Sequence, residues 1–138
     1  MPEPNHTYQP EDMDSVFMEG GRSEVRWTPS GKWGNPVGNV HGGYVGVLVD
    51  DVAGMAIYSL VGGSAPTVSI QIDYLHMMPL GVTYTARGEV VRAGKATAIV
   101  DVDVFDPGDV LVARGKAYFQ LPSSWRDDKE RVDKERNR

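Results

Sequence analysis

The sequence of 138 residues contains no cysteine. This absence excludes a disulfide framework, a thiol nucleophile and a thiolate metal site. The three histidines stand at positions 6, 41 and 76, which is no recognised spacing for metal ligands. No metal site is therefore predicted.

Long hydrophobic runs and an excess of positive charge are also missing. No uninterrupted apolar run approaches the roughly 18 residues of a membrane span, and the N-terminus lacks the basic and apolar regions of a secretion signal. A net charge of −5 argues against broad binding to nucleic acid, which needs a basic face. With 41% hydrophobic and 24% charged residues, the composition is that of a soluble globular protein, and the cytoplasm is the expected location.

The chain has the length of one domain, because a split would leave two pieces too small to bury adequate cores. Residues 1–20 are rich in proline and acidic side chains and are predicted to be a flexible leader, with one helical turn around Asp14–Met18. Residues 21–122 form the predicted domain. Residues 123–138 carry six basic and five acidic side chains, which predicts a solvated helix or a disordered tail.

One long amphipathic helix is predicted from His41, ending at Val61-Gly62-Gly63. Its apolar positions follow the i, i+3, i+4, i+7 pattern over four turns: Val45, Leu48, Val49, Val52, Ala53, Ala56, Ile57 and Leu60. On a helical wheel Asp50 borders this apolar stripe, whereas Asp51 falls near the opposite pole and is expected to face solvent.

Alternating segments rich in β-branched residues predict strands before and after the helix. They are Glu24–Thr28, Thr67–Leu75, Val82–Val91, Thr97–Phe105 and Val110–Leu121. Turn residues separate the later segments, so the last four strands are predicted to form consecutive hairpins in an antiparallel meander. One long helix packed on one face of this sheet is an α+β fold.

The predicted helix begins with the features of an acyl-transfer site. Main-chain N–H groups at a helix start have no intrahelical partners, and the pair Gly42-Gly43 would let a carbonyl oxygen approach them, as in an oxyanion hole. Asp50 lies about two turns further on, roughly 12 Å from Gly42 along the axis. A second copy of the helix, antiparallel to the first, could bring its Asp50 beside this Gly42, so the spacing indicates a symmetric dimer.

These residues resemble the hotdog-fold acyl-CoA thioesterases, specifically the PaaI-like branch of the 4-hydroxybenzoyl-CoA thioesterase superfamily. The matching features are a loop asparagine (Asn35), His41-Gly42-Gly43, an aspartate nine residues after the histidine (Asp50) and a strand serine (Ser69). The resemblance runs from about Trp27 to Leu121. It implies a hotdog fold, in which a five- to six-stranded antiparallel sheet wraps a long central helix.

The resemblance also implies a function. The substrate would be an acyl-CoA, with coenzyme A as part of the substrate and no further cofactor. Two subunits would form a continuous double sheet with sites at their interface, and a homotetramer of two such dimers is expected. The N–H of Gly42 would polarise the thioester carbonyl, and Asp50 of the partner subunit would act as general base on water or as nucleophile.

Each assignment has a structural alternative. Gly42 could serve tight packing between loop and helix. Asp50 could be a polar residue at the edge of a helix face, but a carboxylate beside an apolar stripe is costly unless it is used or paired. His41 either binds the thioester carbonyl or fixes the helix start. Asn35 either holds the thioester or water, or is an ordinary turn residue. Ser69 either orients Asp50 or its water, or is plain strand polarity.

Substrate contacts are predicted at both ends of the coenzyme A thioester. Gly43 lies beside the candidate oxyanion donor, and Arg92 and Lys95 flank the Gly94 turn, where they either bind phosphates or are ordinary solubilising charges. Two rival functions stay open: a non-catalytic acyl-CoA binding or sensing protein, and a hotdog hydratase or dehydratase. The acyl group, and the choice between coenzyme A and a carrier protein, are not determined by these residues.

Overall fold

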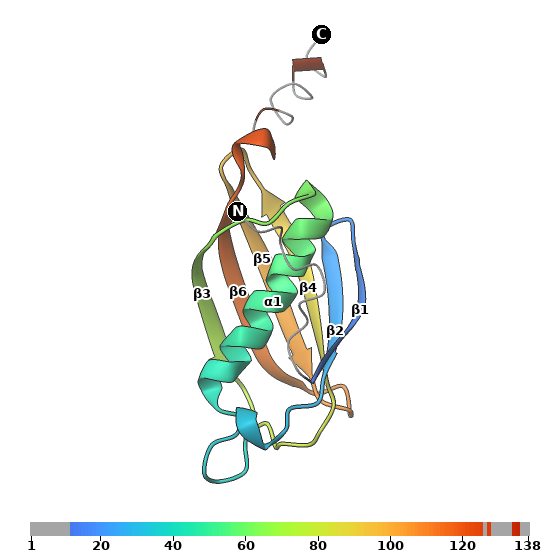
Figure 1. The fold of residues 1–138 in the computed structure, drawn as a ribbon, viewed down its shortest axis with the longest axis vertical. Helices are drawn as coiled ribbons and strands as arrows, with labels where there is room; N and C mark the ends of the chain where they lie inside the picture. Colours follow the sequence, from blue (N-terminus) through green and yellow to red (C-terminus); the bar gives the residue numbers. More distant parts are fainter. Residues whose placement is uncertain (1–11, 126, 128–133, 136–138) are drawn as a thin grey trace, which may run out of the picture.

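The computed structural model describes residues 12–125, 127 and 134–135. One long helix lies in front of a six-stranded sheet (Figure 1). In chain order the elements are β1 (Met13–Glu19), β2 (Arg22–Trp27), the 3₁₀ helix η1 (Gly31–Trp33), α1 (Gly42–Val61), β3 (Thr67–Tyr74), β4 (Tyr84–Ala93), β5 (Thr97–Phe105) and β6 (Leu111–Gln120).

Helix α1 has the predicted ends. His41 is its N-cap, and Gly62 follows its last residue in the left-handed conformation, with φ of 72°, which glycine adopts without steric cost. The predicted apolar stripe is its buried face, formed by Val45, Leu48, Val49, Val52, Ala53, Ala56 and Ile57. By length and composition α1 could also cross a membrane, but here this stripe packs on the sheet as the core of the fold.

The sheet has the strand order β1-β2-β4-β5-β6-β3, and every neighbouring pair is antiparallel. Strands β4, β5 and β6 form the predicted meander, but the expectation that β3 pairs with β4 is wrong, because β3 pairs with β6. Residues 75–83 form a longer connection than a tight hairpin turn, and this length lets the chain cross to a distant strand. Alternation in the sequence identifies a strand's faces but not its partner.

Strand β1 corrects the prediction for the leader. Residues Met13–Glu19 pair with β2 and form one edge of the sheet, so the helical turn expected around Asp14–Met18 is wrong and the sheet begins before residue 21. A bulge between Ser15 and Phe17 interrupts the alternation, which hides the strand from a periodicity argument. Residues 1–11 and most of the predicted tail lie outside the described residues.

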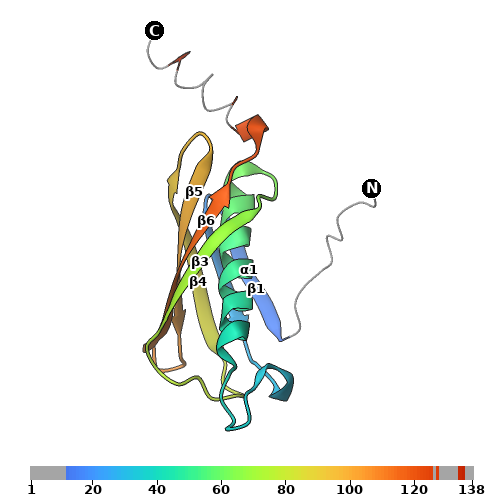
Figure 2. The ribbon, with the colours of Figure 1, turned by 90° about the vertical axis from the view of Figure 1, so that its left-hand side faces the viewer.

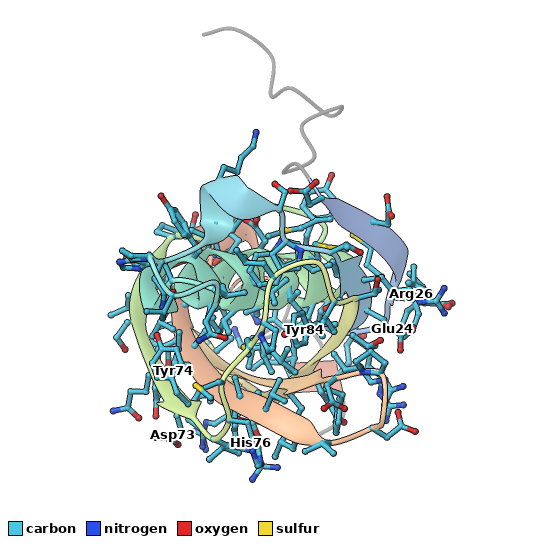
Figure 3. All side chains as sticks on the ribbon, turned by 90° about the horizontal axis from the view of Figure 1, so that it is seen from below. Glu24, Arg26, Asp73, Tyr74, His76 and Tyr84 are labelled. Carbon is cyan, nitrogen blue, oxygen red and sulfur yellow. The ribbon has the colours of Figure 1, made fainter. Side chains whose placement is uncertain are left out.

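The sheet curves around the helix, as the view along the helix from its start shows (Figure 3). Turned by 90°, the fold shows two layers, with α1 on one side of the sheet (Figure 2). Two glycines allow the close approach. A Cβ at Gly115 would lie 2.6 Å from Val49 Cγ1, and a Cβ at Gly88 would lie 3.1 Å from the Val52 carbonyl oxygen. The buried Ser23 hydroxyl donates to this same carbonyl at 2.7 Å.

We expect Gly88→Ala to destabilise the protein by about 1–3 kcal/mol, because its Cβ must displace Ser23 and Val52 in a close-packed core. Gly54→Ala is the matched control. A Cβ at Gly54 meets nothing within 4 Å, and alanine favours a helix interior by about 1 kcal/mol over glycine. Urea unfolding at one fixed protein concentration measures both changes. Equal stability of Gly88→Ala and the unmodified protein would contradict the proposed contact.

Candidate active site

The first turn of α1 leaves one main-chain donor free. His41 accepts the N–H of Gly43 on its side-chain Nδ1 at 3.1 Å, and its own N–H donates to the Trp33 carbonyl at 2.8 Å. The structure therefore supports the role of His41 in fixing the helix start. Among the described residues, the N–H of Gly42 has no hydrogen-bond partner, so it is the donor left for a substrate oxygen.

Asn35 organises the loop before the helix. Its side-chain oxygen accepts the N–H groups of Val37 and Asn39, both at 3.1 Å, and its own N–H donates to the Asn39 carbonyl. This is the turn role that was one of the two readings of the sequence. Its side-chain NH₂ has no partner within the described part of the chain, and this group stays available to a ligand.

Tyr74 fastens the helix start to strand β3. Its hydroxyl donates to the Gly42 carbonyl at 2.7 Å, and in Figure 3 it lies on the inner side of the β3 end, whereas Asp73 points outward. The sequence analysis did not identify this residue. Its signal was the alternation of β3, which places Tyr74 on the same face as Ile70 and Ile72, two residues that pack against the core.

Asp50 lies on the side of α1 that faces β3. One of its carboxylate oxygens accepts the Thr67 hydroxyl at 2.7 Å. Asp50 forms no ion pair with any described residue, and its carboxylate is only half-buried. The acid is therefore oriented by one neutral donor and is free to act as a base or nucleophile.

Within one protomer Thr67, and not Ser69, orients Asp50. The pairing register shifts between Thr67 and Ser69, which pair with Phe119 and Tyr118. Phe119 is buried, whereas Tyr118 lines the outer face of the sheet. This bulge turns Thr67 toward the helix and leaves Ser69 exposed on the outer side. Thr67 carries a hydroxyl group at the start of the same strand, two residues before Ser69, and this feature could have identified it from the sequence.

Asp51 does not face solvent as predicted. Its side chain is half-buried, and its Oδ2 is buried without a hydrogen-bond partner among the described residues. Burial, followed by the negative charge of Asp50, raises the pKa of Asp51 from 3.8 to about 6. A helical wheel places a side chain around the axis but does not include the side chains that surround it.

The remaining predicted site residues do not converge in one protomer. Gly42 and Asp50 stand roughly 12 Å apart along the axis of α1, at about 1.5 Å per residue. Arg92 and Lys95 are exposed near the turn between β4 and β5, which lies beside the opposite end of α1 (Figure 1). Gly43 is exposed beside Gly42. Within one protomer the predicted site residues therefore fall into two separated groups.

A groove of about 550 Å³ lies on the outer face of the sheet, away from α1. Two ion pairs join neighbouring strands in its lining, since Arg114 contacts Asp103 at 2.9 Å and Lys116 contacts Asp101 at 3.7 Å. In the described ranges no group of three or more His, Cys, Asp or Glu side chains is placed to hold a metal ion.

Comparison with known proteins finds a matching family model and similar proteins. The family model of the Thioesterase superfamily matches residues 37–113. Human acyl-coenzyme A thioesterase 13 is 33% identical over 85 residues, which cover 59% of this chain and 60% of that protein. The match thus spans less than two thirds of that relative's length.

Solved structures share the fold. A protein of Streptococcus mutans UA159 bound to acetyl CoA superposes with a TM-score of 0.78 at 30% identity, covering 87% of this chain and 97% of that one. The Escherichia coli PaaI protein from the phenylacetic acid degradation operon gives a TM-score of 0.75 at 25% identity, covering 80% and 79%. These similarities confirm the predicted hotdog arrangement of one long helix wrapped by an antiparallel sheet.

We expect Asp51→Asn to stabilise the protein at pH 7 by about 1–2 kcal/mol. A rise in pKa of about two units corresponds to about 3 kcal/mol at about 1.4 kcal/mol per unit, and solvent screening of the partly exposed carboxylate reduces this value. The folded state holds this carboxylate at a raised pKa of about 6. As the pH falls from 7 to 5, the folded state takes up a proton that the unfolded state does not, and the unmodified protein gains stability. The advantage of Asp51→Asn should therefore shrink over this range. Thermal unfolding from pH 5 to 8 tests it, and parallel curves for both proteins would refute it.

Proposed function

Because the chain belongs to the Thioesterase superfamily, we propose that it hydrolyses an acyl-CoA to the free acid and coenzyme A. One observation carries this proposal. A carboxylate without an ion pair, Asp50, and a main-chain donor without a hydrogen bond, Gly42, both judged over the described residues, stand on one helix beside the same edge strand, β3. The names of the human relative and of the acetyl-CoA-bound structure support the substrate class.

The active unit that we propose is a homodimer formed through β3. This strand is an edge of the sheet, so its outer row of main-chain groups has no partner strand. Exposed apolar side chains gather on and beside it: Val68 is 65% exposed, Tyr74 55%, Leu75 49% and Met77 79%. Contiguous exposed apolar groups mark interaction sites. The opposite edge, β1, carries a bulge and the acidic residues Asp14 and Glu19, which disfavour pairing.

A two-fold axis at β3 makes the two halves complementary. It runs the two copies of β3 antiparallel and sets the two helices in opposite directions, so that Asp50 of each subunit approaches Gly42 of the other. The same operation moves the turn with Arg92 and Lys95 toward the partner's helix start, where the coenzyme A phosphates would lie. Two such dimers would form the expected tetramer.

In this arrangement the thioester oxygen accepts the free N–H of Gly42, which stabilises the negative charge that develops on that oxygen. Asp50 either removes a proton from the attacking water or attacks the carbonyl carbon itself, forming an anhydride that water then hydrolyses. Both routes consume one water and release the acid and the thiol of coenzyme A. Thr67 keeps the carboxylate in one orientation.

Asp50→Asn should lower kcat by about 10²–10⁴, the usual contribution of a general base, while the fold remains intact because the amide retains an acceptor for Thr67. Thr67→Val should lower kcat less, by about tenfold, because it removes the hydrogen bond that orients Asp50 but leaves the carboxylate in place. Release of free thiol from a panel of acyl-CoA compounds measures both. Unchanged turnover in Asp50→Asn would reject Asp50 as the base or nucleophile, whereas absence of thiol release by the unmodified protein would favour a non-catalytic binding protein.

Gly42→Pro should lower kcat by about 10²–10³, because it deletes the proposed oxyanion donor. The substitution suits the position: proline is favoured at the first residue of a helix, and His41 already has the extended conformation that a following proline requires. Gly42→Ala is the matched control, which adds a Cβ at 3.4 Å from the Tyr74 hydroxyl and keeps the N–H.

The same variants test whether the site is shared. Mixed dimers of Asp50→Asn and Gly42→Pro protomers contain one site with both groups intact and one site with neither. Denaturing and refolding the two variants together should therefore recover activity that neither variant shows alone. No recovery, with mixed dimers demonstrated by mass spectrometry, would mean that both groups act within one protomer.

A further inference from the structure

The first described residue of the chain is bound to the loop that carries the helix start. One carboxylate oxygen of Asp12, Oδ2, accepts two hydrogen bonds, from the Ser30 hydroxyl at 2.9 Å and from the Trp33 indole N–H at 2.8 Å. Its main-chain carbonyl accepts the N–H of Thr28 at 2.9 Å. Asp12 thus clamps the short helix η1 to the beginning of β1.

Trp33 connects this clamp to the candidate oxyanion donor. Its carbonyl accepts the N–H of His41 at 2.8 Å, one residue before Gly42. Its ring stands edge-on to two aromatic neighbours, with centroids 5.7 Å from the fully buried Trp27 and 5.0 Å from Tyr44 in the first turn of α1. The main chain and the side chain of Trp33 therefore both contact the helix start, and the indole N–H sets the angle of the ring.

We propose that Asp12 is a positioning residue for the oxyanion donor: through Trp33 it holds the His41–Gly42 peptide at the angle that aims the Gly42 N–H at the substrate. This inference rests on the thioesterase function proposed above. It assigns a catalytic consequence to a residue that directly precedes β1, the edge strand farthest from β3.

The backbone at Asp12 supports a role beyond chain connection. Its φ is 69°, in the left-handed region that few residues other than glycine, asparagine and aspartate adopt. Such a conformation persists where the surroundings hold it, and here the holding contacts are the main-chain bond from Thr28 and the two bonds to the carboxylate. Glycine at this position would keep the left-handed backbone and the main-chain bond and would lose the contacts of the carboxylate.

Asp109 provides the matched control. It is also an aspartate in the left-handed region, with φ of 61°, and it lies in the turn between β5 and β6. Asp109→Gly makes the same change of charge and backbone freedom, and no described contact joins Asp109 to η1 or to the helix start. A general effect of losing an acidic, left-handed residue would appear in both variants.

For Asp12→Gly we expect kcat to fall about tenfold, with a smaller change in KM and in the melting temperature. The loss should stay below the roughly hundredfold or larger loss from deleting an oxyanion donor, because the donor remains but is misaimed. Asp12→Asn, which keeps one acceptor and the backbone preference, should recover part of the rate. Asp109→Gly should match the unmodified protein.

Trp33→Phe extends the test along the proposed path, since it removes the indole N–H and keeps an aromatic ring. If Asp12 acts through this bond, the double variant Asp12→Gly/Trp33→Phe should be no slower than the slower single variant. If the reductions in kcat of the two single variants multiply in the double variant, Asp12 acts by another route and the assignment is overturned.

An activity-independent measurement separates this inference from the proposed function. In ¹H–¹⁵N spectra, Asp12→Gly should shift the Trp33 indole resonance and the amide resonances of His41 and Gly42, whereas Asp109→Gly should not. Absence of thiol release by the unmodified protein would reject the thioesterase proposal alone. Unmoved His41 and Gly42 resonances, or a kcat equal to that of Asp109→Gly, would reject the positioning role alone.

Discussion

The close approach of α1 to the sheet at Gly88 and Gly115 fixes the rotation of the helix about its axis, and the placement of the site depends on that rotation. A side chain at either glycine would collide with Val52 or Val49. With the helix held in this orientation, Asp50 faces β3 and meets Thr67, while Gly42 meets Tyr74. A rotation by one residue position would move the carboxylate away from the open edge. The contacts that pack the core therefore also set the directions in which Asp50 and Gly42 face.

The single helix also explains why, in the proposed dimer, each protomer would carry only half of a working site. A helix start supplies free N–H groups only within its first turn, and the carboxylate lies two turns away, where the sheet still leaves it exposed. The distance along a rigid helix cannot be shortened by loop motion. In the proposed dimer, one two-fold operation at β3 would join the halves twice and cover an edge that would otherwise stay open.

The helix start is held from several directions, and this has a consequence for catalysis. Tyr74 holds the Gly42 carbonyl from β3, His41 caps Gly43, and Trp33 binds the His41 N–H while Asp12 orients its ring. A donor stabilises developing charge only if it is already aimed, since reorientation during the reaction would cost energy. The contacts come from β1, η1 and β3, so residues distant in sequence share the task of aiming one N–H group.

Local chemistry in the sequence determined the helix, its two ends, the approximate bounds of five strands, and the presence of a donor and an acid on one helix. These features depend on neighbours a few residues apart, which periodicity and capping rules describe. Only the tertiary structure decided that β3 pairs with β6, that Thr67 rather than Ser69 meets Asp50 within a protomer, that Asp51 is half-buried, and that Asp12 and Tyr74 support the helix start. Each of these depends on segments far apart in the chain, and a bulge or a crossing connection changes which side chains meet without leaving a periodic trace.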